Sequence, residues 1–164
     1  MSRKAPLVAI GGYCLMPNHI HLLLREIVDG GISKFMHKVG TGYTMYFNIL
    51  HQRVGNLFVK PFRSKHIGDD TYLQHASSYL HLNPAELFEA GWKHGVVTNM
   101  HALETRIREY RYSSLPDFYG SDRPESAILD QEFIETLALR PLRDMLSDAH
   151  EYYADSVDMI EKLR

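Results

Sequence analysis

The sequence predicts an α+β fold in which one β-hairpin precedes a series of helices. Residues 6–15 and 19–25 are apolar runs of strand length, and the Pro-Asn pair between them is typical of a turn. Neighbouring strands joined by such a short turn are expected to pair antiparallel. Gly11 and Gly12 are expected to form a bulge or bend in the first strand. Further along the chain, apolar residues recur at steps of three and four, which predicts amphipathic helices.

The expected helices have recognisable boundaries. Ser33 is a favourable N-cap for a helix over residues 33–50. Asp69 or Asp70 can cap a second helix, which ends at about Leu82 because an Asn-Pro pair follows. The remaining predicted segments are an extended piece over 58–67, a short turn over 85–90, a helix near 100–109, and one or two amphipathic helices from about residue 130.

Length and composition favour one compact intracellular domain. The chain has 164 residues, of which 45% are hydrophobic, and this is enough for a single core. Its one cysteine, Cys14, excludes an internal disulfide framework and fits a reducing, cytoplasmic setting. No apolar run approaches the length of a membrane span, and the N-terminus lacks a signal-peptide pattern, so no membrane partner is expected.

The net charge of −2 conceals two regions of opposite charge. Residues 30–68 contain six basic and no acidic side chains, whereas residues 117–164 contain 12 acidic and 5 basic ones. Nucleic acid is therefore a candidate partner of the middle of the chain but not of its tail. A solvated helix face is the alternative interpretation of the same bases. The basic residues in the middle are Lys34, Lys38, Arg53, Lys60, Arg63 and Lys65.

Aromatic residues are interleaved with these bases. Phe58 and Phe62 lie beside them in the sequence, and such rings can stack on unpaired bases. Tyr43 and Tyr46 have helical spacing and are predicted to face the core instead.

Two histidines alternate on the second predicted strand. Side chains two residues apart in a strand point to the same face, so His19 and His21 are expected to lie side by side. Two adjacent imidazoles are half of a metal site. Two unrelated polar residues on a solvent-exposed face would show the same spacing.

One face of the second helix carries further polar groups. His75, Tyr79 and Asn83 follow one another at steps of four and therefore share this face. A phenol there can act as a nucleophile towards a phosphate held by a metal, and the amide can act as a ligand. A core aromatic residue beside a C-capping asparagine is the alternative. The two half-sites become one stronger candidate if this helix packs beside His19 and His21.

Six motifs follow one another in a defined order between about residues 10 and 120. They are Met16-Pro17-Asn18-His19-Ile20-His21-Leu22-Leu23, Ile32-Ser33-Lys34-Phe35-Met36, Tyr43-Thr44-Met45-Tyr46-Phe47-Asn48, Gly55-Asn56-Leu57-Phe58, Tyr79-Leu80-His81-Leu82-Asn83-Pro84 and Tyr112-Ser113-Ser114. In order and spacing, this set resembles the REP-associated tyrosine transposases of the His-hydrophobic-His superfamily.

The resemblance implies a metal-dependent enzyme that cleaves and transfers single-stranded DNA with hairpin ends. Tyr79 matches the catalytic tyrosine, which forms a 5′-phosphotyrosine link and releases a 3′-OH. His19, His21 and Asn83 match the ligands of Mg²⁺ or Mn²⁺, although these ions otherwise prefer oxygen ligands. The six basic residues of the middle region would follow DNA phosphates. We expect a cytoplasmic, nucleoid-associated monomer or homodimer.

The resemblance also implies a ferredoxin-like antiparallel sheet with helices packed on one face. Residues 1–120 are expected to form the catalytic domain, and residues 121–164 an acidic helical extension without a counterpart in the family pattern. The chain begins close to the strand over residues 6–15, so the family's first strand and helix are expected to be missing. A truncated or domesticated derivative that binds single-stranded DNA without catalysis is therefore the second hypothesis.

Two other interpretations of the histidines are weaker. A histidine-triad nucleotide hydrolase needs a third alternating histidine, where this chain has Leu23. A structural zinc site needs a tetrahedral ligand set, which the scattered histidines and the lone cysteine do not obviously supply. His66, His75 and His81 are interpreted as surface or packing residues, with assistance to phosphate binding or proton transfer as the alternative.

Overall fold

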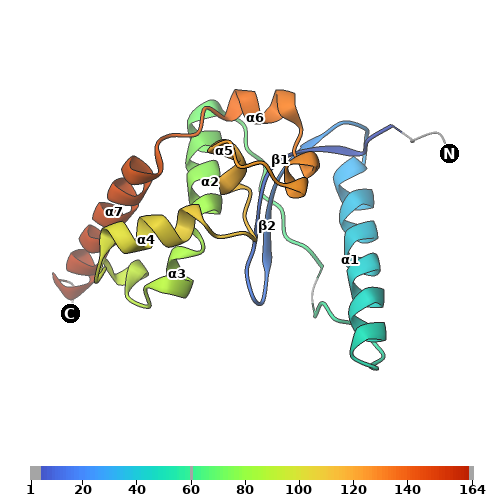
Figure 1. Ribbon diagram of the computed structural model, residues 1–164, viewed down its shortest axis with the longest axis horizontal. Coiled ribbons are helices and arrows are strands. Elements are labelled where there is room, and N and C mark those ends of the chain that lie inside the picture. Colours follow the sequence, from blue (N-terminus) through green and yellow to red (C-terminus); the bar gives the residue numbers. More distant parts are fainter. Residues whose placement is uncertain (1–4, 60, 163–164) are drawn as a thin grey trace. The chain divides into compact units, whose positions relative to one another are not determined.

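A computed structural model, which describes residues 5–59 and 61–162, has the predicted α+β fold (Figure 1). Strands β1 (Val8–Leu15) and β2 (Ile20–Glu26) form a two-stranded antiparallel sheet. The chain divides into two compact units. The first unit contains residues 1–9 and 24–67, and the second unit contains residues 10–23 and 68–164.

The β-hairpin agrees closely with the sequence prediction. β1 runs through Gly11 and Gly12 without a break. At Gly11 the absence of a side chain serves packing, because a Cβ there would lie 2.8 Å from the ring of Phe133 in helix α6 (Gln131–Leu137). The glycine thus allows an aromatic side chain from the C-terminal region to rest directly on the strand.

Helix α1 (Gly31–Leu50) belongs to the first unit and begins two residues before the predicted start. Its N-cap is Gly30, in the left-handed region at a φ of 67°, so the prediction of Ser33 as the cap is wrong. Glu26 at the end of β2 supplies the acceptor instead. Its Oε2 accepts the backbone N–H of Ile32 at 2.9 Å and satisfies a donor that the first helical turn leaves free.

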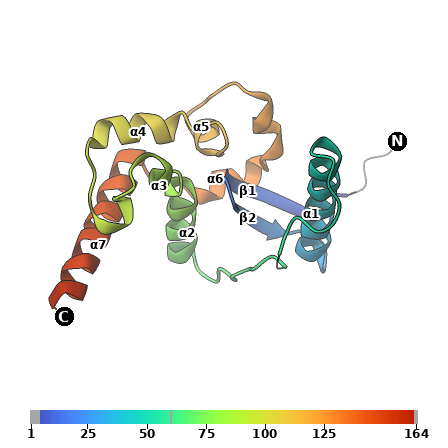
Figure 2. The ribbon, with the colours of Figure 1, turned by 90° about the horizontal axis from the view of Figure 1, so that it is seen from below.

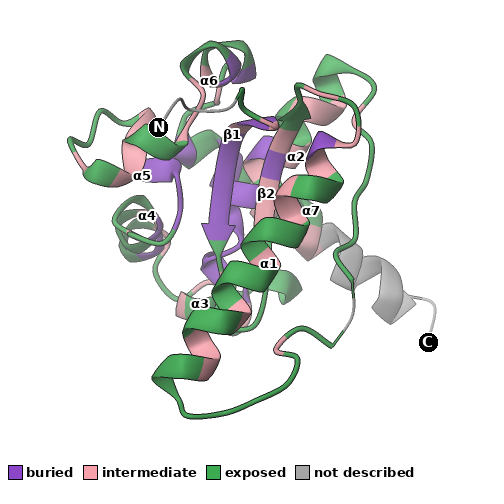
Figure 3. Cartoon of the chain, turned by 90° about the vertical axis from the view of Figure 1, so that its right-hand side faces the viewer, coloured by how far each residue is buried: buried purple, intermediate pink, exposed green. Residues whose placement is uncertain are grey.

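The apolar stripe of α1 is largely exposed, and Figure 3 colours most of this helix accordingly. Tyr43 and Tyr46 are 49% and 61% exposed, so the prediction that they face the core is wrong. Tyr43 lies near two rings of its own unit, with the ring centroids of Phe47 and Phe58 each 6.2 Å away. The described residues of the first unit contain no second helix that could cover the stripe. The extended piece predicted after α1 is irregular, with no strand among residues 58–59 and 61–67.

Helix α2 (Asp70–Leu82) lies in the second unit and begins where the sequence predicts. Asp69 caps it, because its Oδ1 accepts the backbone N–H of Tyr72 at 2.8 Å. The helix ends at Asn83, and Pro84 then begins a short helical turn. The cap and the stop both depend on side chains next to each other in the sequence, which is why the sequence predicts them.

The rest of the second unit consists of helices packed around one apolar core (Figures 1 and 2). Leu82, Trp92, Leu103, Ile107 and Leu146 are among the buried residues of this core. The further elements of the unit are α3 (Ala85–Phe88), η1 (Trp92–His94), α4 (Met100–Arg108), α5 (Leu115–Phe118), η2 (Pro124–Ile128) and α7 (Leu142–Lys162). The predicted amphipathic tail corresponds to α6 and α7, and α7 contacts α2 and α4.

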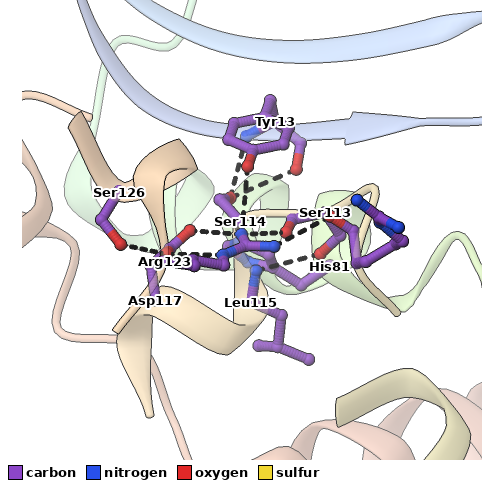
Figure 4. Close-up of polar contacts among 9 residues, drawn as sticks. Tyr13, His81, Ser113, Ser114, Leu115, Asp117, Arg123 and Ser126 are labelled. Carbon is purple, nitrogen blue, oxygen red and sulfur yellow. Dashed lines mark hydrogen bonds and ion pairs between the residues drawn. The ribbon is translucent and has the colours of Figure 1, made fainter. Parts of the chain in front are cut away.

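A buried ion pair attaches the segment after α5 to β1 (Figure 4). Arg123 donates through Nε to Asp117 Oδ1 at 2.8 Å and through Nη2 to Asp117 Oδ2 at 2.5 Å. The same guanidinium donates to the hydroxyl of Tyr13 at 3.0 Å and to the carbonyl of Ser113 at 2.6 Å. Hydrogen bonds from Arg123 and Ser126 outweigh burial and lower the pKa of Asp117. These hydrogen bonds satisfy most of the guanidinium, as a buried charge requires.

Cys14 is the penultimate residue of β1 and is fully buried. It forms an isolated antiparallel bridge with Ser113, and burial raises the pKa of its thiol to about 12. Among the described residues, no helix combines the length and the apolar character needed to cross a membrane.

Candidate functional site

The two histidines of the hairpin lie against each other in the second unit. Nε2 of His19 is 2.9 Å from Nε2 of His21, and their ring centroids are 4.7 Å apart. Leu23, the next residue on the same face of β2, is buried. His21 is half-buried and His19 is exposed, so this face packs into the unit at Leu23 and opens to solvent at His19.

Asn18 orients the first of these histidines. Its Oδ1 can only accept, so Nδ1 of His19, 2.6 Å away, must carry a proton and donate it. The lone pair of a neutral His19 is then on Nε2, the atom that faces His21. From the sequence, Asn18 is predicted only as a turn residue, although its position directly before His19 is a signal for this second role.

Helix α2 brings Tyr79 and Asn83 to the same place. The ring of Tyr79 meets the ring of His21 edge-on, with the centroids 5.8 Å apart. Asn83 donates through Nδ2 to the carbonyl of Tyr79 at 2.8 Å, and its side chain also hydrogen bonds with His21. Burial and the neighbouring His19 lower the pKa of His21, while Asn83 opposes this effect. The four residues that the sequence singled out for catalysis and metal binding thus form one cluster.

A buried serine holds the hairpin against α2 (Figure 4). Oγ of Ser114 accepts the backbone N–H of Tyr13 at 2.9 Å and lies 2.9 Å from Nε2 of His81. His81 is fully buried, which confirms that it is a packing residue, and burial lowers its pKa to about 4. It lies two residues after Tyr79 on the same helix. Ser114 therefore connects the strand that leads to the histidines with the helix that carries the tyrosine.

The cluster is compatible with a divalent cation. Octahedral Mg²⁺ has ligand distances of about 2.1 Å, so two adjacent ligands are ~3.0 Å apart. The 2.9 Å between the two Nε2 atoms matches this separation, and the lowered pKa of His21 keeps its imidazole in the neutral form that a metal ligand needs. Among the described residues, no group of three or more His, Cys, Asp or Glu side chains converges. Asn83 is the polar side chain that α2 places beside His21.

Tyr79 also lines a cavity of about 390 Å³ in the second unit. The walls come from α2, from Trp92 in η1 and from α7. Asn83 and His75 line the same cavity, which confirms that the three residues at steps of four share one helical face. The cavity draws on residues from 75 to 153, so no local sequence pattern could have predicted it.

An ion pair lies close to Tyr79 and was missed in the sequence. The ammonium of Lys93 contacts Oε1 of Glu86, and this hydrogen bond is the main cause of the raised pKa of Lys93. The phenol of Tyr79 lies close enough to contribute to the same shift. Glu86 follows α2 by one turn and Lys93 lies in η1, so their meeting depends on the chain reversal between them.

The basic residues predicted to bind DNA lie in the first unit, and the structure does not place them relative to the cluster around Tyr79. Lys60 lies outside the described residues. Lys34 donates to the carbonyl of Asp29, and the guanidinium of Arg53 lies 5.7 Å from the ring centroid of Phe47. The five described members are all exposed: Lys34, Lys38, Arg53, Arg63 and Lys65.

Comparison with known proteins yields no match: no family model, no curated protein and no solved structure is significantly similar to this chain.

Proposed function

We propose that this chain is a metal-dependent enzyme that cleaves and transfers single-stranded DNA through a covalent link to Tyr79. The observation that carries the proposal is the contact between Tyr79 and His21 within the cluster of His19, His21 and Asn83. A nucleophile beside a candidate cation site is the arrangement that phosphoryl transfer requires. The six ordered motifs, which resemble those of the REP-associated tyrosine transposases, support the same function.

The proposed chemistry has two steps in which the atoms balance. The hydroxyl oxygen of Tyr79 attacks a DNA phosphorus, and the bond from phosphorus to the 3′ oxygen breaks. The proton lost by the phenol is balanced by the proton gained by the leaving 3′ oxygen, with no other reactant consumed. A 3′-OH of another strand end then attacks the phosphotyrosine, so that the DNA is rejoined and the tyrosine is released.

His19, His21 and Asn83 are the residues that would hold Mg²⁺ or Mn²⁺. When bound, such an ion neutralises the charge of the scissile phosphate and orients it for in-line attack. The chain's own residues prepare the site for it. Asn18 fixes the proton of His19 on Nδ1, and the contact from Asn83 fixes the orientation of His21.

Single-stranded DNA with hairpin ends is the proposed substrate. The exposed basic side chains of the first unit, among them Lys34 and Lys38, are suited to binding phosphates, because residues 30–68 contain no acidic side chain. The exposed rings of Phe58 and Phe62 are suited to stacking on unpaired bases. The ferredoxin-like fold is proposed on the same resemblance.

The decisive experiment is a search for the covalent intermediate. Purified protein is incubated with a labelled single-stranded hairpin DNA and Mn²⁺, then denatured and separated on a gel. We expect an adduct that forms with the wild type and is abolished by Tyr79→Phe, whereas DNA affinity changes by only a few fold. Tyr112→Phe is the matched control, because this exposed tyrosine lies in the same unit but not at the cavity.

Two other outcomes of this experiment would contradict the proposal. An adduct that survives in Tyr79→Phe would exclude this residue as the nucleophile. DNA binding without any adduct, over a range of divalent ions and pH, would favour the alternative of a derivative that binds single-stranded DNA without cutting it.

A further inference from the structure

We infer that the cavity beside Tyr79 receives the unpaired base of a nucleotide next to the scissile phosphate. This inference rests on the proposed function, and it assigns a specificity pocket to residues of η1 and α7 for which no role was predicted. The cavity volume of about 390 Å³ falls within the usual range of small-molecule sites, ~300–1,000 Å³.

The position of Tyr79 in the cavity wall brings the bound strand close to the cavity. Tyr79 lines the cavity, so a phosphate presented to its hydroxyl lies at the cavity's edge. The nucleotides on either side of that phosphate extend in opposite directions along the strand. One of the two bases is then able to turn into the cavity while the phosphate stays at Tyr79 and the His19–His21 pair.

The walls suit a flat, aromatic group. Trp92 and Tyr153 meet edge-on with their ring centroids 5.8 Å apart, and Tyr152 lies beside Tyr153 at 5.6 Å. All three line the cavity, where Trp92 is buried and Tyr152 and Tyr153 are the accessible rings. Aromatic side chains that stack on bases are the usual means by which proteins bind single strands.

The charges of the lining favour a neutral group over a second phosphate. Its two carboxylates are both paired, Glu86 with Lys93 and Asp148 with Arg140. Paired charges leave the cavity close to neutral, which would not attract a polyanion. The same carboxylates and the hydroxyl of Ser78 offer acceptors at the edge, where base amino groups can donate.

The test uses the single tryptophan of the chain as a reporter, because Trp92 lies in the wall of the cavity. Tyr79→Phe protein, which cannot form the adduct, is titrated with a hairpin oligonucleotide. Two further oligonucleotides lack one base each, on the 5′ or the 3′ side of the scissile phosphate. We expect a change in Trp92 fluorescence with the complete DNA, lost when one of the two bases is absent. Removal of that base should weaken binding about tenfold.

A cavity variant provides the second measurement. Tyr152→Ala removes an exposed ring without opening the core, since this side chain is 68% exposed. In otherwise wild-type protein it should lower cleavage of the complete substrate about tenfold while changing cleavage of the abasic one little. Tyr112→Ala, which removes a similarly exposed ring away from the cavity, should lower neither.

The failure of this inference is distinguishable from failure of the proposed function. If the complete DNA is cleaved and both abasic forms are cleaved and bound equally well, the cavity holds no base and the inference is overturned. If no DNA gives an adduct, the proposed function fails, and a fluorescence change that still depends on one base would then assign the cavity to base binding alone.

Discussion

Nε2 of His81 lies 2.9 Å from Oγ of Ser114, in the interior of the second unit. His81 belongs to the helix of Tyr79, and Ser114 also accepts the N–H of Tyr13 in the strand that leads to the His19–His21 pair. One hydroxyl thus links the helix of the proposed nucleophile to the strand that leads to the proposed metal ligands.

Removing this hydroxyl should loosen both elements. Ser114→Ala leaves the N–H of Tyr13 and Nε2 of His81 without the hydroxyl as partner, which costs about 1–3 kcal/mol of unfolding free energy. Urea denaturation measures this loss, and Ser121→Ala, at an exposed position of the same unit, is the control. An unchanged unfolding free energy would show that the serine does not connect strand and helix.

The stability of the protein should fall between pH 6.5 and pH 4. Burial lowers the pKa of His81 to about 4 in the folded protein, whereas an exposed histidine titrates near 6.5. The unfolded chain therefore takes up a proton at higher pH than the folded chain, and protonation favours unfolding. The contribution is complete above about pH 6.5 and decreases by roughly 3 kcal/mol as the pH falls to 4, of which about 2 kcal/mol is lost by pH 5.

Urea titrations of metal-free protein at several pH values measure this dependence. His81→Gln should flatten it, because the amide has no such proton to gain. An equally steep dependence in the variant would assign the acid sensitivity to other titratable groups.

Asn18 should control metal affinity without touching the metal. Asn18→Ala removes the acceptor that holds the proton of His19 on Nδ1, and loss of such a partner typically weakens metal binding 10- to 100-fold. Asn18→Asp keeps an acceptor at this position and should restore most of the affinity. Isothermal calorimetry with Mn²⁺ tests both variants, and equal affinity of the alanine variant and the wild type would contradict the role of Asn18.

Lys93 should favour the attack of Tyr79 through its charge. Lys93→Met removes the cation beside the phenol and leaves the Glu86 carboxylate without its partner, and both changes should disfavour the phenolate and slow single-turnover cleavage about tenfold. Arg143→Met removes an exposed cation of α7 that does not line the cavity, and it should have no such effect. A drop in affinity with a constant rate would make Lys93 a DNA contact instead.

The basic side chains of the first unit should contribute to DNA affinity through counterion release. Lys34→Ala combined with Lys38→Ala should weaken DNA binding and reduce the slope of log affinity against log salt by about 1.4, the value for two phosphate contacts on a single strand. Fluorescence anisotropy over a salt series measures this slope. A slope equal to that of the wild type would mean that these lysines form only a solvated surface.

The sequence predicts those features that depend on neighbouring residues. The Asp69 cap, the stop at Asn83 and the alternation of His19 and His21 are of this kind, and all three appear in the structure. The N-cap of α1 was predicted wrongly because Glu26, six residues before Ile32, supplies the acceptor. Distant side chains decide such positions, and one sequence does not record which distant side chains meet.

The same limit applies to the candidate site. Tyr79 and Asn83 could be selected because helical spacing places them on one face, whereas the meeting of Lys93 with Glu86 requires the packing of η1. The cavity requires α7, which joins the site from more than 60 residues further along the chain. The ion pair and the cavity therefore depend on tertiary packing and not on a local sequence pattern.

The buried thiol of Cys14 is a natural probe for local opening of β1 in the native protein. A thiol that is fully covered and has a pKa of about 12 is inert towards alkylating reagents in the closed protein. Reaction becomes possible only when the bridge to Ser113 separates, so the labelling rate reports how often β1 detaches from the segment that holds it. A single native thiol thereby allows the opening rate of β1, the strand paired with the one that carries His21, to be measured without introducing a cysteine.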